Sequence, residues 1–247
     1  MPDMTQDIQV LDGNVTLRQP AKGFRTSLDA VLLAAACPAG AGDRILDMGC
    51  GVGSVSFCLL HRVPGCYVTG FDILPDYIAL AQDNIALNGA QGHAAFSCAA
   101  LDQYPVPTMA DRFDHVVCNP PFMEAGDHMP SPEQARALAN GHQAQEMTVK
   151  DWIDKAFFCL KPGGSLTLVH RADRTDRIIR DLGRRFGRTD IIPLWPKAGQ
   201  DARRVIIRTV RDRKSPCSLR SGLVLHEDDG TYTRAADDIL RRAQALV

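Results

Sequence analysis

The sequence predicts an α/β fold in which helices cover both faces of one mostly parallel sheet. Short apolar runs alternate with helix-periodic segments, and glycine or proline clusters separate the two kinds. The 247 residues are 45% hydrophobic and 23% charged, which is usual for a globular protein and excludes a disordered or collagen-like chain. We expect a Rossmann-like sheet of seven strands with one antiparallel edge strand, followed by a small C-terminal extension.

Seven segments are expected to be strands because each is a short apolar run beside a turn signal. The last two have no helix between them, so they are expected to pair antiparallel at one edge of the sheet. In chain order the strands are residues 44–48, 66–73, 94–98, 113–118, 165–170, 190–195 and 204–210.

Helices are expected where apolar residues recur every three to four positions. Ser27 is in place to cap the first of them, and Pro75 suits the first turn of another. The expected helices cover residues 28–36, 54–61, 75–87, 148–160, 172–186 and 235–246.

The main domain is expected to span residues 1–214, with residues 1–40 as a cap segment ahead of the first strand. Residues 215–247 form the extension, in which Asp228-Asp229-Gly230 predicts a hairpin turn before the last helix. Residues 123–147 have no strand pattern. So long a segment inside a compact domain is often a functional loop, and a lid over the target is our hypothesis for it.

Cysteine use and hydropathy indicate a cytoplasmic protein. No two of the eight cysteines are spaced Cys-x-x-Cys, so we expect no metal. Most are expected to be small buried side chains in a reducing compartment. No apolar run reaches ~18 residues, and the start lacks a basic flank before an apolar stretch, so we expect neither a membrane span nor a secretory signal.

The formal net charge of −1 hides an asymmetry. Residues 161–214 contain 15 Lys and Arg against 6 Asp and Glu, whereas residues 1–160 contain 9 against 18. A basic face on a neutral protein is typical of a site for a polyanion. The alternative is a solvated helix face on which Asp173, Asp176 and Asp181 pair with the arginines. The charges alone leave both interpretations open.

A glycine loop follows the first expected strand and precedes a helix. Such a loop lets backbone N–H groups approach a ligand closely. Its third glycine comes one position earlier than in the dinucleotide motif. The pattern Asp-x-Gly-x-Gly-x-Gly resembles the first motif of S-adenosylmethionine-dependent methyltransferases. The resemblance implies that Asp47 binds the amino group of the cofactor's methionine part, and that the loop itself holds the cofactor through Gly49, Cys50, Gly51 and Gly53.

Asp72 is expected to end the second strand, 25 residues after Asp47. Its two carboxylate oxygens match the two vicinal hydroxyls of a ribose, with Ile73 beside them. The alternative role for Asp72 is to cap the helix that begins at Pro75. The methyltransferase resemblance also implies a group near the adenine after the third strand, and Asp102 is the candidate there.

The tetrapeptide Asn119-Pro120-Pro121-Phe122 follows the fourth expected strand. Ligands of open parallel sheets lie beyond the carboxyl ends of the strands, so the tetrapeptide and the glycine loop should meet in one crevice. The motif resembles that of methyltransferases which act on planar amino nitrogens, namely adenine N6, guanine N2 and glutamine amides.

The chemistry of an aromatic amine explains the residue types in this motif. The Asn119 side-chain oxygen and the Pro120 carbonyl would accept the two amine N–H bonds and stabilise the positive charge that develops during transfer. The prolines would hold the carbonyl rigidly, and Phe122 would stack on the target base. The alternative is a strand-ending Pro-Pro turn with a buried phenylalanine.

Almost the whole chain resembles bacterial enzymes that methylate N6 of an anticodon-loop adenine in a valine tRNA. The resemblance lies in residues 23–33 (GFRTSLDAVLL), in Asn-Pro-Pro-Phe, and in tail segments such as residues 222–226 (GLVLH). It implies a class I methyltransferase fold, S-adenosylmethionine as cofactor and tRNA as partner. Phosphates would be bound by arginines of residues 161–214, which we call the basic block; Arg171, Arg203 and Arg204 are the candidates.

Other functions remain open at this stage. The same chemistry could act on a guanine N2 in ribosomal RNA or on a glutamine amide in a release factor. A rival of another class is a scaffold or partner subunit that binds the cofactor without catalysis. Asp29, in the first turn of the first helix, either complements the helix dipole or contacts a ligand.

Overall fold

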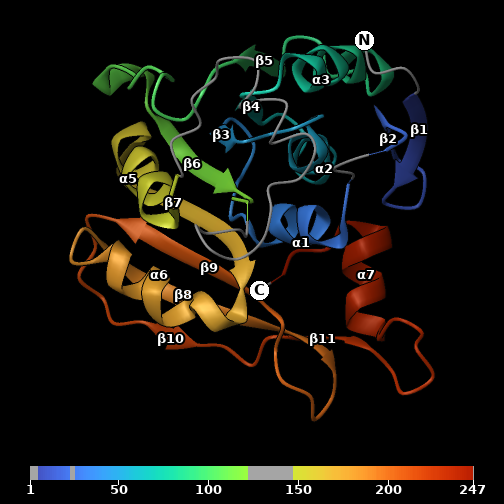
Figure 1. Cartoon of the computed structure of the whole chain (residues 1–247), viewed down its shortest axis with the longest axis vertical. Coiled ribbons are helices and arrows are strands. Elements are labelled where there is room, and N and C mark those ends of the chain that lie inside the picture. The colour runs from blue at the N-terminus through green and yellow to red at the C-terminus, as the bar shows by residue number, and fades with distance from the viewer. Residues whose placement is uncertain (1–4, 23–25, 122–146, 247) are drawn as a thin grey trace.

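One sheet forms the centre of the protein (Figure 1). The computed structural model describes residues 5–22, 26–121 and 147–246. Within these residues the sheet has nine strands in the order β10-β8-β9-β7-β6-β3-β4-β5, and β11 also pairs with β8. The bounds are β3 (Arg44–Met48), β4 (Tyr67–Asp72), β5 (Ala94–Cys98), β6 (Phe113–Cys118), β7 (Leu160–Arg171), β8 (Phe186–Lys197), β9 (Arg204–Arg211), β10 (Ser218–Leu219) and β11 (Leu223–His226).

The α/β class and the mostly parallel sheet are confirmed, but the edge differs from the expectation in two ways. The expected antiparallel pairing of the last two of the seven strands is confirmed for β8 and β9, but β9 lies between β8 and β7 and not at the edge, and it pairs antiparallel with both. The strand count is nine and not seven because β10 and β11, from the C-terminal extension, pair parallel with β8. They supply hydrogen-bond partners to a strand edge that would otherwise be open.

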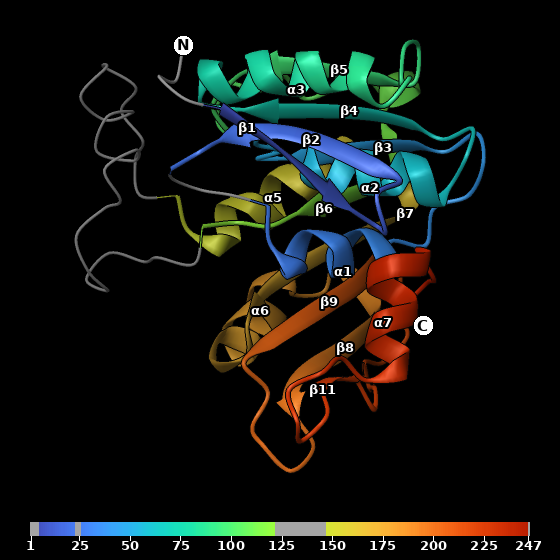
Figure 2. The ribbon, with the colours of Figure 1, turned by 90° about the vertical axis from the view of Figure 1, so that its right-hand side faces the viewer.

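Helices cover both faces of the sheet (Figure 2). One face carries α1 (Leu28–Ala36), α2 (Ser54–Arg62), α3 (Pro75–Leu87) and α7 (Arg234–Arg242), and the other carries α5 (Val149–Cys159) and α6 (Thr175–Leu182). Neighbouring residues of each central strand enter different cores. Ile45 packs with the first group of helices and Leu46 with the second, as the alternation of strand side chains requires.

Three expected elements end elsewhere. The helix expected over residues 172–186 is a short 3-10 turn followed by α6, which stops before Gly183 at φ +58°, and Phe186 begins β8. The hairpin expected around Asp228-Asp229-Gly230 reduces to a single bridge between His226 and Tyr232, because β11 pairs with β8 instead. The last helix ends at Arg242, after which Ala243 is left-handed.

A hairpin at the N-terminus was not expected from the sequence. β1 (Thr5–Val10) and β2 (Val15–Pro20) pair antiparallel beside α3. The signal for it is the Asp12-Gly13 pair between two alternating segments.

Two asparagines, Asn84 on α3 and Asn88 at its C-terminal end, take the place of a neighbouring strand for β2. Asn88 accepts the Thr16 N–H at 3.0 Å and donates to the Thr16 carbonyl at 2.7 Å. Asn84, fully buried, does the same for Arg18 at 2.7 and 3.1 Å, and also donates to the Val52 carbonyl in the glycine loop at 3.0 Å. The Asn84 amide therefore ties the hairpin, α3 and the glycine loop together.

In the part of the chain that the structure describes, no helix is both long enough and apolar enough to span a membrane.

Replacing Asn84 by alanine should lower the free energy of unfolding by about 2–4 kcal/mol, since a buried side chain loses three hydrogen bonds and the buried Val52 carbonyl loses its donor. Urea unfolding followed by circular dichroism measures this. Gln82→Ala, at an exposed position of the same helix, is the matched control and should change stability little. Equal destabilisation of the two variants would contradict the role given to Asn84.

Candidate active site

The glycine loop joins β3 to α2 at the carboxyl end of the sheet. The N–H groups of Gly49 and Cys50 both donate to the Phe71 carbonyl of β4, at 2.9 and 3.0 Å. Gly49, Gly51 and Gly53 have φ values of +69°, +54° and +87°, a region that favours glycine. The loop therefore depends on glycine for its backbone shape.

Two of these glycines also lie where no side chain fits. A Cβ on Gly49 would come within 2.8 Å of the Trp152 ring of α5, and one on Gly53 within 2.6 Å of the Phe57 ring. The loop is thus packed tightly between helices from both faces of the sheet.

Asp72 ends β4 and fixes the loop from the neighbouring strand. One carboxylate oxygen accepts the Gly51 N–H at 2.9 Å, and the other accepts the Leu74 N–H at 2.9 Å. Burial raises the pKa of this carboxyl above its ordinary value, against those two hydrogen bonds. Each of the two roles expected for Asp72, capping of α3 and ligand binding, corresponds to a contact in the structure. Asp72 accepts a bond from the residue that precedes α3, and it also lies against the glycine loop. The predicted ribose contact stays a prediction.

Asp47 lies one residue before the end of β3 and is buried. The Ser56 hydroxyl donates to its carboxylate at 2.6 Å. Burial raises the pKa of Asp47 to about 7, and the nearby Asp72 charge contributes. Asp47 does not line the pocket described next, so its predicted bond to an amino group stays a prediction.

A pocket opens at the glycine loop, between the loop, α1 and the end of β6. Its lining combines hydroxyl groups, one carboxamide and apolar side chains: Thr26, Ser27, Ala30, Gly49, Cys50, Gly51, Val52, Ser54, Val55, Tyr77 and Asn119. The pocket thus brings together the glycine loop and Asn119, which are far apart in the sequence.

Thr26 and Ser27 form one wall of the pocket, a role that the sequence did not predict for them. The Thr26 N–H donates to the buried Gln19 side chain of β2 at 2.9 Å, and the Thr26 and Ser54 hydroxyls lie 2.6 Å apart. Ser27 precedes α1 with an extended backbone, but its side chain makes no capping bond, contrary to the expectation. Ser27 instead lines the pocket.

The Asn-Pro-Pro-Phe motif begins directly after β6. Asn119 is half-buried and lines the pocket, Pro120 is buried and Pro121 is exposed. Phe122 lies outside the described residues, as do residues 123–146 of the expected loop. The roles predicted for these residues stay predictions.

Asp102 and Ile73 lie in two neighbouring loops. Asp102 is exposed in the turn after β5, and Ile73 follows Asp72 and accepts a bond from the Cys98 thiol at 3.6 Å. Neither lines the pocket. A contact between Asp102 and an adenine ring stays a prediction.

Comparisons with known proteins agree with this architecture. Residues 26–135 match the family model described as "Methyltransferase small domain". The tRNA1(Val) (adenine(37)-N6)-methyltransferase of Aeromonas hydrophila is 27% identical over 216 residues, 85% of this chain and 86% of that protein. A predicted O-methyltransferase from Agrobacterium tumefaciens has the same fold, with a TM-score of 0.72, 24% identity and coverage of 89% of this chain and 98% of that one.

A third relative has a different substrate. The release factor glutamine methyltransferase of Salmonella typhimurium is 31% identical over 155 residues, which are 60% of this chain and 53% of that protein. Both sequence relatives are named as methyltransferases, and the glycine loop and Asn119 both lie within the matched family model. The chain is a class I, S-adenosylmethionine-dependent methyltransferase. The resemblance to the valine-tRNA enzymes extends over most of its length.

The residues of this methyltransferase fit such a cofactor. S-adenosylmethionine carries an ammonium and a sulfonium, and two carboxylates, Asp47 and Asp72, lie next to the loop with raised pKa values. A cationic ligand would offset their mutual repulsion. The Gly51 backbone lines the pocket without a Cβ, which allows a ligand to approach the chain closely.

The three arginines predicted to contact RNA have different surroundings. Arg203 is exposed, just before β9. Arg171, at the end of β7, pairs with Asp173 at 2.5 Å, and Arg204 pairs with Asp29 of α1 at 3.2 Å. Asp29 therefore ties α1 to β9. The two pairs commit much of the charge of Arg171 and Arg204 within the chain, whereas Arg203 stays a candidate for RNA.

Three aspartates of the basic block pair with arginines, as the interpretation of a solvated helix face requires. Asp173 binds Arg171, Asp176 binds Arg180 at 2.7 Å, and Asp181 lies 3.9 Å from Arg177. Across the described residues, no group of three or more His, Cys, Asp and Glu side chains is arranged to bind a metal ion.

The pKa of Asp47 predicts a pH dependence of stability. An unfolded aspartate has a pKa of about 3.9, whereas that of folded Asp47 is about 7. The folded state therefore binds the proton more tightly, so this group's contribution is fully present below about pH 4 and is lost as the pH rises to about 7. Over that window wild-type stability should fall relative to Asp47→Asn by at least about 1.4 kcal/mol, the value of one pKa unit.

Urea unfolding of ligand-free protein at pH 4.5, 6.0 and 7.5 measures the difference. The asparagine keeps an acceptor for the Ser56 hydroxyl, which makes the comparison conservative. Parallel stability curves for the two proteins would show that Asp47 does not titrate in this range.

Proposed function

We propose that this methyltransferase transfers a methyl group from S-adenosylmethionine to the exocyclic N6 of adenine in tRNA, at the anticodon loop of a valine tRNA. The observation that carries the proposal is that Asn119 lines the same pocket as Gly49, Cys50 and Gly51. The residue proposed to bind the methyl-accepting amine therefore lies beside the loop expected to hold the methyl donor. The likeness to the Aeromonas hydrophila enzyme, which covers 85% of this chain, supports the choice of tRNA.

The residues around the amine explain how the reaction is assisted. The Asn119 side-chain oxygen and the Pro120 carbonyl accept the two N–H bonds of the amine. These acceptors favour a pyramidal nitrogen with its lone pair directed at the methyl group and stabilise the positive charge that develops there. Pro120 is buried and its φ is restricted, so its carbonyl keeps its position. The cationic product loses its proton readily, so no strong general base is needed.

A base in a single-stranded loop suits this site. Such a base can be splayed out of the RNA and stacked on an aromatic side chain at modest cost. Phe122 is the residue proposed for that stacking. A tRNA substrate also places the reaction in the cytoplasm.

The second candidate is a glutamine amide in a release factor, which the Salmonella typhimurium relative favours. That likeness covers 60% of this chain, whereas the likeness to the valine-tRNA enzyme covers 85% of it. The amide would use Asn119 and Pro120 in the same way, so the substrate and not the mechanism distinguishes the two candidates.

Methyl-labelled S-adenosylmethionine tests the proposal. The protein is incubated separately with unmodified tRNA, ribosomal RNA and a protein extract, and each product is digested to nucleosides or amino acids. We expect label in N6-methyladenosine from tRNA. Label in methylguanosine or methylglutamine would overturn the substrate, and no label in any reaction would favour a non-catalytic scaffold.

The variant Asn119→Ala tests the mechanism. It should lower turnover at least ~100-fold, as removal of one preorganised polar group at a reacting centre does elsewhere. The affinity for S-adenosylhomocysteine, measured by calorimetry, should change little. A variant with a near-normal rate would show that Asn119 does not hold the amine.

A further inference from the structure

The Lys and Arg side chains of the basic block fall into two groups that differ in their surroundings. Many of its cations pair with carboxylates of the same chain, as Arg185 does with Asp154 at 2.5 Å and Arg208 with Asp190 at 2.8 Å. A second group is exposed and forms no ion pair with any residue of the described ranges; apart from Arg203 just before β9, its members are Arg184, Arg188, Arg213 and Lys214. We call these four residues the distal patch.

Backbone hydrogen bonds hold the distal patch together. The Asp212 N–H donates to the Arg185 carbonyl at 2.8 Å, and the Arg188 N–H donates to the Ser215 carbonyl at 2.9 Å. The segment after β9 therefore runs beside the segment that begins β8. Gly187 permits this approach, because a Cβ there would lie 2.5 Å from the Arg213 carbonyl oxygen.

A bulge directs one of these arginines outward. The pairing of β8 with β9 shifts register between Gly187 and Asp190, and Arg188 within the shift has φ +50°. A left-handed conformation is uncommon for a residue with a side chain, and bulges often re-aim a side chain. The strained backbone thus presents an exposed guanidinium near the start of β8, and such strain points to a functional cause.

The distal patch lies at the opposite end of the sheet from the pocket. β8 runs parallel to β7 and β6, because both β8 and β7 pair antiparallel with β9. The start of β8 is therefore at the amino ends of the strands, whereas Asn119 follows the carboxyl end of β6. At about 3.3 Å per residue and about 4.8 Å per strand, the strand register separates Arg211, two residues before Arg213, from Asn119 by roughly 20 Å.

We propose that the distal patch binds the phosphate backbone of the RNA substrate, away from the base that is methylated. Three guanidinium groups and one ammonium suit phosphate oxygens, which arginine binds through two N–H groups at once. One turn of a nucleic-acid duplex is on the order of 30 Å long, so a stem next to the target loop can reach both places. The inference rests on the proposed function, since it assumes an RNA substrate.

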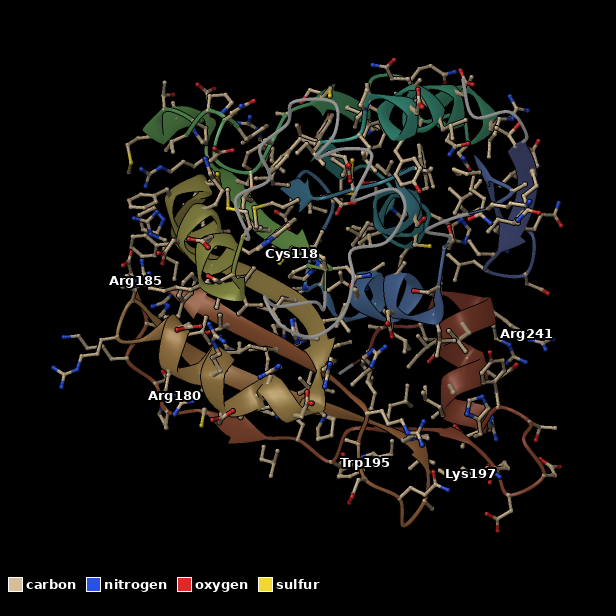
Figure 3. The ribbon with its side chains drawn as sticks, viewed as in Figure 1. Cys118, Arg180, Arg185, Trp195, Lys197 and Arg241 are labelled. Carbon is tan, nitrogen blue, oxygen red and sulfur yellow. The ribbon has the colours of Figure 1, made fainter. Side chains whose placement is uncertain are left out.

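The carboxylates near the distal patch pair with cations outside it, so the patch presents positive charge. Asp212, the carboxylate within the patch segment, pairs with Arg211 at 3.0 Å, and Asp154 is held by Arg185 and Lys150. Figure 3 labels Arg185 beside this region, on the other side of the molecule from Arg241 of α7. That arrangement provides a control on the far side of the protein.

The test compares two triple variants with the same change in charge. The patch variant is Arg184→Gln with Arg213→Gln and Lys214→Gln, and the control is Arg234→Gln with Arg241→Gln and Arg242→Gln on α7. For full-length tRNA we expect KM to rise about tenfold in the patch variant, with kcat within twofold of wild type. The slope of log affinity against log salt should become shallower by about 2–3, because each phosphate that the protein no longer neutralises reduces it by ~0.9.

The control variant should keep KM within twofold of wild type. Arg188→Gly provides a second test that suits the left-handed backbone, and it should raise KM about threefold. Wild-type KM and salt slope in the patch variant, with tRNA methylation intact in the wild type, would overturn the distal patch alone. Absence of RNA methylation by the wild type would overturn the proposed function and this inference together. Competition by polyglutamate but not by RNA would indicate an acidic protein partner instead.

Discussion

The Asp72 carboxylate accepts the N–H groups of Gly51 and Leu74, and the shape of the cofactor pocket depends on that pair of bonds. A loop with three left-handed glycines has little conformational preference of its own. Its position is set by β4, through Asp72 and through the Phe71 carbonyl that accepts two more N–H bonds. The shape of the glycine loop is therefore set by the neighbouring strand as much as by the loop itself.

The surrounding elements are arranged around that fixed loop. Asn84 reaches the loop from α3 and simultaneously completes β2, whose Gln19 positions Thr26 at the pocket wall. From the other side, β6 delivers Asn119 to the same pocket because parallel strands share their carboxyl ends.

The sequence predicts the parts that depend on local patterns. The first helix, β3 and the glycine loop follow from apolar runs and glycine spacing, and Asn119 follows from a motif at a strand end. The position of β9 between β7 and β8, and the addition of β10 and β11 to the sheet, depend on which strands pair with the two edges of β8. No local sequence pattern contains that information. Gln19 and Asn84 were missed because a buried carboxamide looks in sequence like any surface polar residue. The pairing of Arg204 with Asp29 joins positions 175 residues apart, so spacing gave no sign of it.

Hydrogen exchange of the loop amides, followed by mass spectrometry in the ligand-free protein, tests the central role of Asp72. In Asp72→Ala we expect a peptide that covers residues 49–57 to exchange at least tenfold faster than in wild type. Asp76→Ala, at an exposed position in the first turn of α3, should leave it unchanged. Equal protection of the loop in Asp72→Ala and wild type would contradict the account, because the loop would then hold its shape without the carboxylate.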